Sequence, residues 1–397
     1  MCVVAAVLAV LVFDEHYRFF DMVIYHDAIR WWTHGGDLYD YVAPVRGQLG
    51  FTYPPFAAFA LMPVASVSAA TAGWLNAAGS VLALAVVLAV LTAPLAARLG
   101  RSRPAVLAVA VPLALATEPV RQTLGLGQVN LWLFALIVVD LVVLSRRGSR
   151  WTGVGVGIAT AIKLTPGLFI VYLLVTRQWR AAGTACATVA ALTVGGFLLA
   201  PAESVRYFGD LMWQPGRVGA AEALTNQALS GLLARLHAPS GWWLVVSLLV
   251  LAIGLHRARQ AFRAGDELTA LTLTGLTANL VSPMSWTHHL VFLPVAVLLL
   301  TTRAVRLRDP LSAVVALSAY ALSVVSPIWF APGGVLVENA YTLMLIVLVV
   351  ALPAQHTAER IASAITSTAT ARSRSRSASA SDSPVASATT ASPSYRE

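Results

Sequence analysis

The sequence predicts an all-α, polytopic integral membrane protein, and three observations carry this prediction. Of its 397 residues, 58% are hydrophobic and 11% are charged, whereas soluble domains carry about 25% charged residues. Apolar runs separated by short polar breaks recur along almost the whole chain, and arginines gather in alternate breaks. These observations exclude the soluble classes of protein. They also remove nucleic-acid binding as an explanation of the net charge of +9.

The apolar runs define the expected helices in order. A spanning helix needs about 20 apolar residues. The run 1–13 is too short and lacks the basic start and cleavage site of a signal peptide, so we expect it to be the end of a first span. With partial helices counted, we expect a bundle of about 11–12 transmembrane or partial helices. The runs long enough to span are 72–97, 124–144, 180–200, 241–257, 286–302, 310–326 and 339–355, and the shorter ones are 104–117 and 268–281.

Arginine clusters set the expected orientation. They fall at 98–103, 146–150, 177–180, 257–263 and 303–308 and again after 357, and the positive-inside rule places such breaks in the cytoplasm. The alternate breaks then face outward: 14–55, 118–123, about 163–166, 201–240, 282–287 and 327–338. The Ser/Ala/Thr/Arg-rich segment 357–397 lacks apolar periodicity, which predicts a disordered cytoplasmic tail. Residues 1–356 form the expected membrane domain.

The first outward loop, 14–55, carries candidate catalytic carboxylates. From Phe20 its pattern is helical, with Phe20, Ile24 and Trp31 on one face, which predicts an amphipathic helix lying on the outer interface. This helix holds Asp21 and Asp27 near the lipid surface. A carboxylate at a partly desolvated interface can act as a general base, which is worth ~10²–10⁴-fold in rate. The alternative for each is a solvated loop acid or a charge at a helix N-terminus.

A second constellation interrupts the apolar stretch 153–175 at Lys163-Leu164-Thr165-Pro166. Each half has about 12 residues and is ~18 Å long, too short for a ~30 Å hydrocarbon core, so we expect a hairpin or two short spans with Lys163 near the outward apex. Thr165 and Pro166 suit the N-cap and first position of a helix, and a helix N-terminus beside a lysine is an anion site. Alternatively, Lys163 caps the preceding half-helix and extends to water.

A third constellation, from Ser285 to His289, lies where one span ends outside and the next begins. Adjacent histidines point about 100° apart on a helix, so we do not expect His288 and His289 to bind one metal together. They can donate hydrogen bonds to a phosphate or a sugar; the alternative is an interfacial Trp/His belt. Arg121, Gln128 and Asn130 are weaker candidates: each is polar, outward and next to a span, and the alternative for each is a structural role. Asp140, inside a span, is either a buried polar group or a relay.

Six short motifs, which occur along this sequence in the family's order, resemble those of the GT-C superfamily of integral-membrane glycosyltransferases, which use polyprenyl-phosphate sugar donors. More narrowly, residues 1–355 resemble the polyprenol-phosphate-mannose-dependent α-(1→2)-mannosyltransferases of glycosyltransferase family 87. The short first span departs from that pattern. The matching pieces are Asp21-x-x-x-Tyr25-x-x-Ala28, Gly36-Asp37-Leu38-Tyr39, Phe51-Thr52-Tyr53-Pro54-Pro55, Gly127-Gln128-Val129-Asn130, Lys163-Leu164-Thr165-Pro166 and Ser285-Trp286-x-His288-His289.

The resemblance implies an inverting transfer of mannose on the extracytoplasmic face of the plasma membrane. Asp21 occupies the position of the family's essential aspartate, with Asp27 as the alternative. Acceptors in this family are phosphatidylinositol mannosides, lipomannan and lipoarabinomannan, and no metal, cofactor or nucleic acid is expected. The residues expected to bind the donor phosphate or sugar are Lys163, His288, His289, Gln128, Asn130 and Arg121, and those expected to bind the acceptor are Tyr25, Trp32 and Tyr53.

Two other classes of function compete with this interpretation. A secondary transporter or lipid flippase also explains many spans and an in-membrane lysine, but it should place its ionisable groups near the bilayer midplane between symmetric halves. No internal repeat is evident in the sequence, and the polar groups gather in outward breaks. A scaffold subunit of an envelope complex is the third class, and it predicts no catalytic aspartate.

Overall fold

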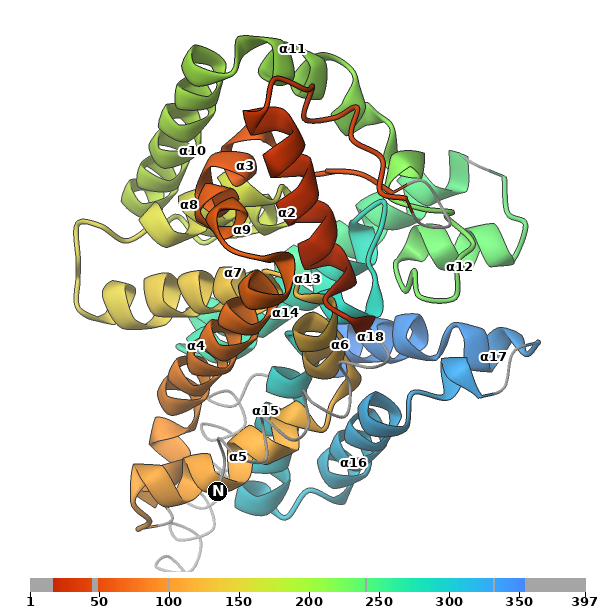
Figure 1. The fold of residues 1–397 in the computed structure, drawn as a ribbon. Helices are drawn as coiled ribbons and strands as arrows, with labels where there is room; N and C mark the ends of the chain where they lie inside the picture. The colour runs from red at the N-terminus through yellow and green to blue at the C-terminus, as the bar shows by residue number, and fades with distance from the viewer. Residues whose placement is uncertain (1–16, 45–48, 99, 240, 331–332, 354–397) are drawn as a thin grey trace, which may run out of the picture.

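The computed structural model describes residues 17–44, 49–98, 100–239, 241–330 and 333–353. Every regular element in these ranges is helical (Figure 1), and one isolated antiparallel bridge joins Asn226 to Trp286. The predicted all-α class is therefore confirmed for the described part of the chain. The apolar run 1–13 and the predicted tail 357–397 lie outside it.

The first half of the chain forms one long helix and many short ones. Its elements are α2 (Phe20–Thr33), α3 (Pro55–Leu61), η1 (Met62–Ser66), α4 (Ala69–Arg98), α5 (Arg103–Leu115), α6 (Glu118–Leu126), α7 (Asn130–Val138), the π-helical η2 (Val139–Leu144), α8 (Val154–Ile162), η3 (Thr165–Gly167) and α9 (Leu168–Val175).

The second half contains longer helices separated by segments that carry short helical turns. Its elements are α10 (Trp179–Leu199), α11 (Pro201–Gly209), η4 (Leu211–Trp213), η5 (Pro215–Arg217), α12 (Leu229–Arg235), α13 (Gly241–Arg263), α14 (Glu267–Val281), η6 (Thr287–His289), α15 (Leu293–Leu307), α16 (Pro310–Val325), η7 (Pro327–Trp329), α17 (Val335–Glu338) and α18 (Ala340–Ala351).

Four helices of the described chain are long and apolar enough to cross a membrane, and α5 with α6 makes a fifth if that pair, bent by 76°, is one span. The four are α4, α10, α13 and α16 with the turn after it, and they match the predicted runs 72–97, 180–200, 241–257 and 310–326. Shorter apolar helices, α7 with η2 among them, lie between these spans. The protein is therefore a polytopic membrane protein.

Three predicted runs are shorter as helices than their hydropathy suggested. One of them is 339–355, where α18 covers only Ala340–Ala351. The run 124–144 is interrupted because Gly127 ends α6 in the left-handed conformation at φ 73°, and α7 begins only at Asn130. A side chain at Gly127 would also meet Met22 Cβ at 2.5 Å, so glycine permits both the turn and the close approach of α2. In the run 286–302, the α-helix begins at Leu293, after η6.

Helix α14 forms the centre of the bundle. All its residues from Thr269 to Leu280 are buried. Three threonine hydroxyls of this helix donate hydrogen bonds to backbone carbonyls one turn earlier. Thr272, Thr274 and Thr277 donate to the carbonyl oxygens of residues 268, 270 and 273 at 2.7–2.9 Å. A helix with its polar groups satisfied in this way packs tightly against protein on all sides. This explains why the run 268–281 is less apolar than the lipid-facing spans.

Three of the connections that carry arginine clusters lie at other edges of the molecule than helices α11, α12 and α17 do (Figure 1). In Figure 1 the α4–α5, η2–α8 and α15–α16 connections lie along the left and lower edges, whereas α11, α12 and α17 lie at the top and right. In this view these three arginine-bearing connections and α11, α12 and α17 thus lie at different edges of the molecule.

Candidate active site

One cavity of about 450 Å³ collects polar side chains from distant parts of the chain. Asp21 reaches it from α2, Lys163 from the break between α8 and η3, and His288 and His289 from η6. Its other walls come largely from the predicted outward breaks, including residues 49–54, 207–225 and 282–286. The volume lies in the range of ~300–1,000 Å³ that is typical of ligand-binding clefts.

Asp21 is held in the first turn of α2 by a directed chain of hydrogen bonds. Tyr25 donates its hydroxyl to the Tyr53 hydroxyl at 2.9 Å, and Tyr53 donates to Gln128 Oε1 at 2.9 Å. Gln128 then donates Nε2–H to Asp21 Oδ2 at 2.7 Å. Each donor is thereby oriented toward the carboxylate, which such a chain stabilises. Within the described ranges, Asp21 Oδ1 accepts no hydrogen bond, which leaves one carboxylate oxygen for a ligand.

The surroundings of Asp21 shift its protonation. Burial raises the pKa of Asp21 to about 6, while the hydrogen bond from Gln128 and the charge of Lys163 act in the opposite direction. Desolvation disfavours the charged form of a carboxyl group. The side chain faces the cavity and is only partly buried, so its free oxygen is accessible from that space. A carboxyl group in this range can accept a proton near neutral pH.

Lys163 lies in the break between α8 and η3. Its Nζ is 3.0 Å from Asn130 Oδ1, 2.9 Å from His289 Nε2 and 3.5 Å from the Tyr53 hydroxyl, and it lies 5.3 Å from the centre of the Tyr53 ring. Burial lowers the pKa of Lys163 to about 7, and the charge of Asp21 opposes this shift. Tyr53 thus joins the lysine to the hydrogen-bond chain of Asp21.

The residues after Lys163 fold differently from the predicted helix start. Thr165 makes no side-chain cap; it opens the 3₁₀ turn η3, and the α-helix begins at Leu168. The prediction of a Thr165 N-cap with Pro166 at the first α-helical position is therefore wrong. The tight turn Thr165-Pro166-Gly167 takes the place of that first α-helical turn. Thr165 still lines the cavity beside Lys163.

The two histidines of η6 face different partners. Their rings are perpendicular, with centroids 4.6 Å apart, and His289 faces Lys163. Side chains of other helices hold the backbone of η6. The His288 carbonyl oxygen accepts hydrogen bonds from Thr123 Oγ1 and from Asn130 Nδ2, each at 3.0 Å. His288 Nε2 is buried and has no hydrogen-bond partner in the described part of the chain. His288 is therefore the histidine that offers a nitrogen to a ligand.

Two of the predicted binding residues lie outside the lining of this cavity. Arg121 donates to the carbonyl oxygens of Ala116 and Val324, and Trp32 donates Nε1–H to Glu203 Oε1 at 2.7 Å. The other predicted residues are part of the site. Tyr25, Tyr53, Gln128, Lys163 and both histidines line the cavity, and Asn130 lies behind it, between Lys163 and His288.

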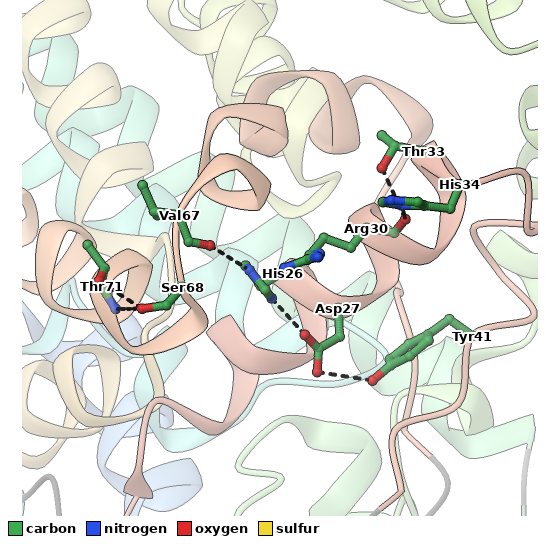
Figure 2. Close-up of polar contacts among 9 residues, drawn as sticks. All are labelled: His26, Asp27, Arg30, Thr33, His34, Tyr41, Val67, Ser68 and Thr71. Carbon is green, nitrogen blue, oxygen red and sulfur yellow. Dashed lines mark hydrogen bonds and ion pairs between the residues drawn. The ribbon is translucent and has the colours of Figure 1, made fainter.

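Asp27 lies on another face of α2, away from the cavity lining. Figure 2 shows its contacts: Oδ1 is 2.6 Å from His26 Nδ1, and Oδ2 accepts from the Tyr41 hydroxyl at 3.4 Å. His26 Nε2 lies 2.9 Å from the carbonyl oxygen of Val67. Because a carbonyl oxygen can only accept, His26 Nε2 is the donor in this hydrogen bond. Asp27 and His26 together fasten α2 to the segment after η1.

The structure identifies two buried acids whose roles the sequence left undetermined. Asp140 accepts the backbone N–H groups of Gly153 and Val156 at 2.8 and 2.9 Å, so it satisfies the start of α8, whose other end carries Lys163. Glu118, a residue of the outward break 118–123, is 2% exposed and accepts three hydrogen bonds, from Gln122, Trp329 and Tyr341. The signal in the sequence is an acid beside an apolar run, which does not reveal the partners. In the described chain, no three His, Cys, Asp or Glu side chains are grouped as metal ligands.

Comparisons of the sequence with a family model and with known proteins indicate the same family. The family model of glycosyltransferase family 87 matches residues 51–283. A polyprenol-phosphate-mannose-dependent alpha-(1-2)-phosphatidylinositol mannoside mannosyltransferase of Mycobacterium tuberculosis is 35% identical over 79% of this chain and 77% of its own length. A protein of the same description from Mycolicibacterium smegmatis is 31% identical over 61% of this chain and 59% of its own.

A third relative, also from Mycolicibacterium smegmatis, is a polyprenol-phosphate-mannose-dependent alpha-(1-2)-phosphatidylinositol pentamannoside mannosyltransferase. It is 31% identical over 51% of this chain and 48% of its own length. No solved structure matches the chain.

Proposed function

The chain belongs to glycosyltransferase family 87 and is a membrane glycosyltransferase, and on this premise we propose that it transfers mannose from polyprenyl-phospho-mannose to a mannosylated lipid. The proposed product linkage is α-(1→2), formed with inversion. The acceptor we propose is a phosphatidylinositol mannoside or a lipoglycan built on one, such as lipomannan or lipoarabinomannan. The names of the relatives support the donor and the kind of acceptor.

The convergence of Asp21, Lys163 and the two histidines on one cavity is the observation that carries this proposal. Transfer from a sugar phosphate requires a base for the acceptor hydroxyl and support for the leaving phosphate. Asp21 Oδ1 is available for the first task. The Lys163 ammonium, which lies 2.9 Å from His289 Nε2, suits the second, because it can donate hydrogen bonds to phosphate oxygens.

The proposed step is a single displacement. Asp21 removes the proton from an acceptor hydroxyl, and that oxygen forms a bond to the anomeric carbon of the β-linked donor. The bond from this carbon to the phosphate oxygen breaks, and its electron pair leaves with the lipid phosphate. The configuration inverts to α. Lys163 stabilises the negative charge that grows on the phosphate. The lipid-linked sugar is a substrate, and the step as written uses no metal or cofactor.

We further propose that the cavity opens at the extracytoplasmic side of the plasma membrane and that the tail after 357 is cytoplasmic. The positive-inside rule supports this orientation. The arginine-bearing connections lie at edges of the molecule away from α11 and α12 (Figure 1), and the segment from α11 to α12 supplies part of the cavity wall. A donor with its polyprenyl chain in the bilayer can then present its phosphate to the site.

The pH dependence of transfer should be bell-shaped. The base must be ionised, and the pKa of Asp21 is about 6, so the rate should fall as the pH drops below that value. The phosphate partner must be protonated, and the pKa of Lys163 is about 7, so donor use should fall as the pH rises above it. We expect kcat/KM for the donor to peak between these values. A rate independent of pH from 5 to 8 would contradict both assignments.

The proposal is tested by incubating the purified protein in proteoliposomes with labelled polyprenyl-phospho-mannose and a panel of mannolipids. We expect label to appear in a phosphatidylinositol mannoside, in a linkage that an α-(1→2)-specific mannosidase removes. Movement of the labelled donor between leaflets with no transfer would support the flippase class instead. Transfer from a nucleotide sugar, but not from the lipid-linked donor, would also contradict the proposal.

A further inference from the structure

One end of the cavity presents a fixed aromatic ring. Trp329 lines the cavity, and 48% of its surface is exposed. Its indole Nε1–H donates to Glu118 Oε1 at 2.7 Å. The nitrogen is therefore held behind the cavity wall by a buried carboxylate, and the ring cannot turn away without breaking a charge-assisted hydrogen bond. Such anchoring presents a rigid ring at low entropic cost to a ligand.

Glu118 builds the wall around that ring. It also accepts from Gln122 Nε2 and from the Tyr341 hydroxyl, each at 2.7 Å. The Gln122 carbonyl oxygen in turn accepts the hydroxyl of Thr287, the residue before His288. These bonds join α6, η6, η7 and α18, which are far apart in the sequence, into one continuous surface. The surface is thus built by specific polar contacts rather than by an exposed loop.

His288 adds an unsatisfied polar atom to the same wall. It lines the cavity and is 6% exposed, and its Nε2 has no hydrogen-bond partner among the described residues. Buried polar atoms in proteins are almost always hydrogen-bonded, so this nitrogen points to a ligand. His289, by contrast, faces Lys163. The succession Lys163, His289, His288, Thr287, Gln122 and Glu118 therefore leads from the cation toward Trp329.

We propose that Trp329, with His288 and the wall that Glu118 anchors, is the subsite for the sugar ring of the acceptor. This inference rests on the function proposed above. A pyranose has an apolar face of C–H groups that packs on an aromatic ring and a rim of hydroxyls that bond to a nitrogen. A neutral ring suits this wall, while the anionic donor phosphate belongs beside Lys163, the one lysine of the chain.

Asp21 lines the same cavity as Lys163 and Trp329. Through Gln128 and Tyr53 it is joined to Lys163. Tyr17, four residues before Asp21 in the sequence, lines the cavity together with Gln122 and Trp329. An acceptor sugar packed on Trp329 thus shares one cavity with the base Asp21 and with a donor phosphate beside Lys163. In this arrangement Trp329 determines the affinity for the acceptor and has no part in the chemistry at the donor.

The variant Trp329→Ala tests whether this ring contributes to the binding of the acceptor and not to the binding of the donor. We expect KM for a mannoside acceptor to rise roughly tenfold, which is the scale of one lost aromatic packing contact. KM for the donor and the slow transfer of its mannose to water should not change. Trp329→Phe, which keeps a ring, should retain most of the affinity. The matched control is Trp213→Ala, because Trp213 is 71% exposed and lies outside the lining of the cavity.

A direct measurement makes the test independent of catalysis. Octyl α-mannobioside, titrated without donor into protein in nanodiscs, should bind roughly tenfold more weakly to Trp329→Ala than to the wild type or Trp213→Ala. Equal binding by all three would overturn the subsite. A parallel rise in the KM of donor and acceptor would overturn it as well. If the wild type binds the mannoside but transfers no mannose, the proposed function fails while the subsite stands.

Discussion

Asp21→Asn should lower the rate of mannosyl transfer by ~10²–10⁴-fold, the usual contribution of a general base. The amide has almost the same shape as the carboxylate but cannot take the acceptor proton. Gln128 donates Nε2–H to Oδ2 of Asp21, and the variant can still accept that bond through its amide oxygen. The bundle should therefore stay folded. The measurement is single-turnover transfer from labelled polyprenyl-phospho-mannose, with donor binding measured in parallel.

Asp27→Asn is the matched comparison, since the same helix carries both acids. Asp27 contacts His26 and Tyr41 (Figure 2) and does not line the cavity. We expect this variant to keep most of the transfer rate and to lose some thermal stability, because the contact that fastens α2 beside η1 is weakened. If Asp27→Asn were inactive and Asp21→Asn were active, Asp27 would be the general base and Asp21 would not. Wild-type rates in both would remove the general base from α2.

Lys163→Met should lower kcat/KM for the donor by about 10²–10³-fold, the scale on which removal of one stabilising donor acts. Methionine keeps much of the length of the side chain and removes its charge. Because Lys163 contacts Asn130, His289 and Tyr53 at the cavity wall, the loss should appear in both donor KM and kcat. KM for the acceptor should change little. The alkaline limb of the pH profile should disappear together with the lysine.

Arg180→Met serves as the control for removal of a cation. Arg180 lies at the start of α10, is exposed, and donates to the carbonyl of Ser149, so we expect its loss to leave donor KM unchanged. Normal donor kinetics in Lys163→Met would remove the lysine from the phosphate site. A retained alkaline limb would assign that limb to another group.

Much of the fold could be predicted because lipid imposes a simple requirement. A helix that faces hydrocarbon must be apolar over a length set by the bilayer, and the runs that became α4, α10, α13 and α16 meet this requirement. Helix α14 is surrounded by protein and can carry threonines that bond to its own backbone. Hydropathy therefore identified the lipid-facing helices clearly and the central helix poorly.

The candidate site was predictable in its residue types and less so in its partners. The motif residues Asp21, Lys163 and His288 do converge. Arg121, a weaker candidate, and Trp32 were also predicted to bind a ligand, yet each is bonded to groups outside the cavity lining. Glu118 gave no signal beyond its position in an outward break. Hydrogen-bond partners hundreds of residues apart depend on how helices pack, which single-sequence patterns do not encode.

The sequence by itself determined the class of the protein, the alternation of its breaks and the motif residues that carry the chemistry. Only the tertiary structure decided which aspartate of α2 lines the cavity. Asp21 and Asp27 are six residues apart, so their side chains point roughly 120° apart around the helix. The rotation of α2 is fixed by the burial of Met22, Ala28 and Ile29, each 0% exposed. Long-range packing sets that rotation, and the amphipathic pattern leaves it open.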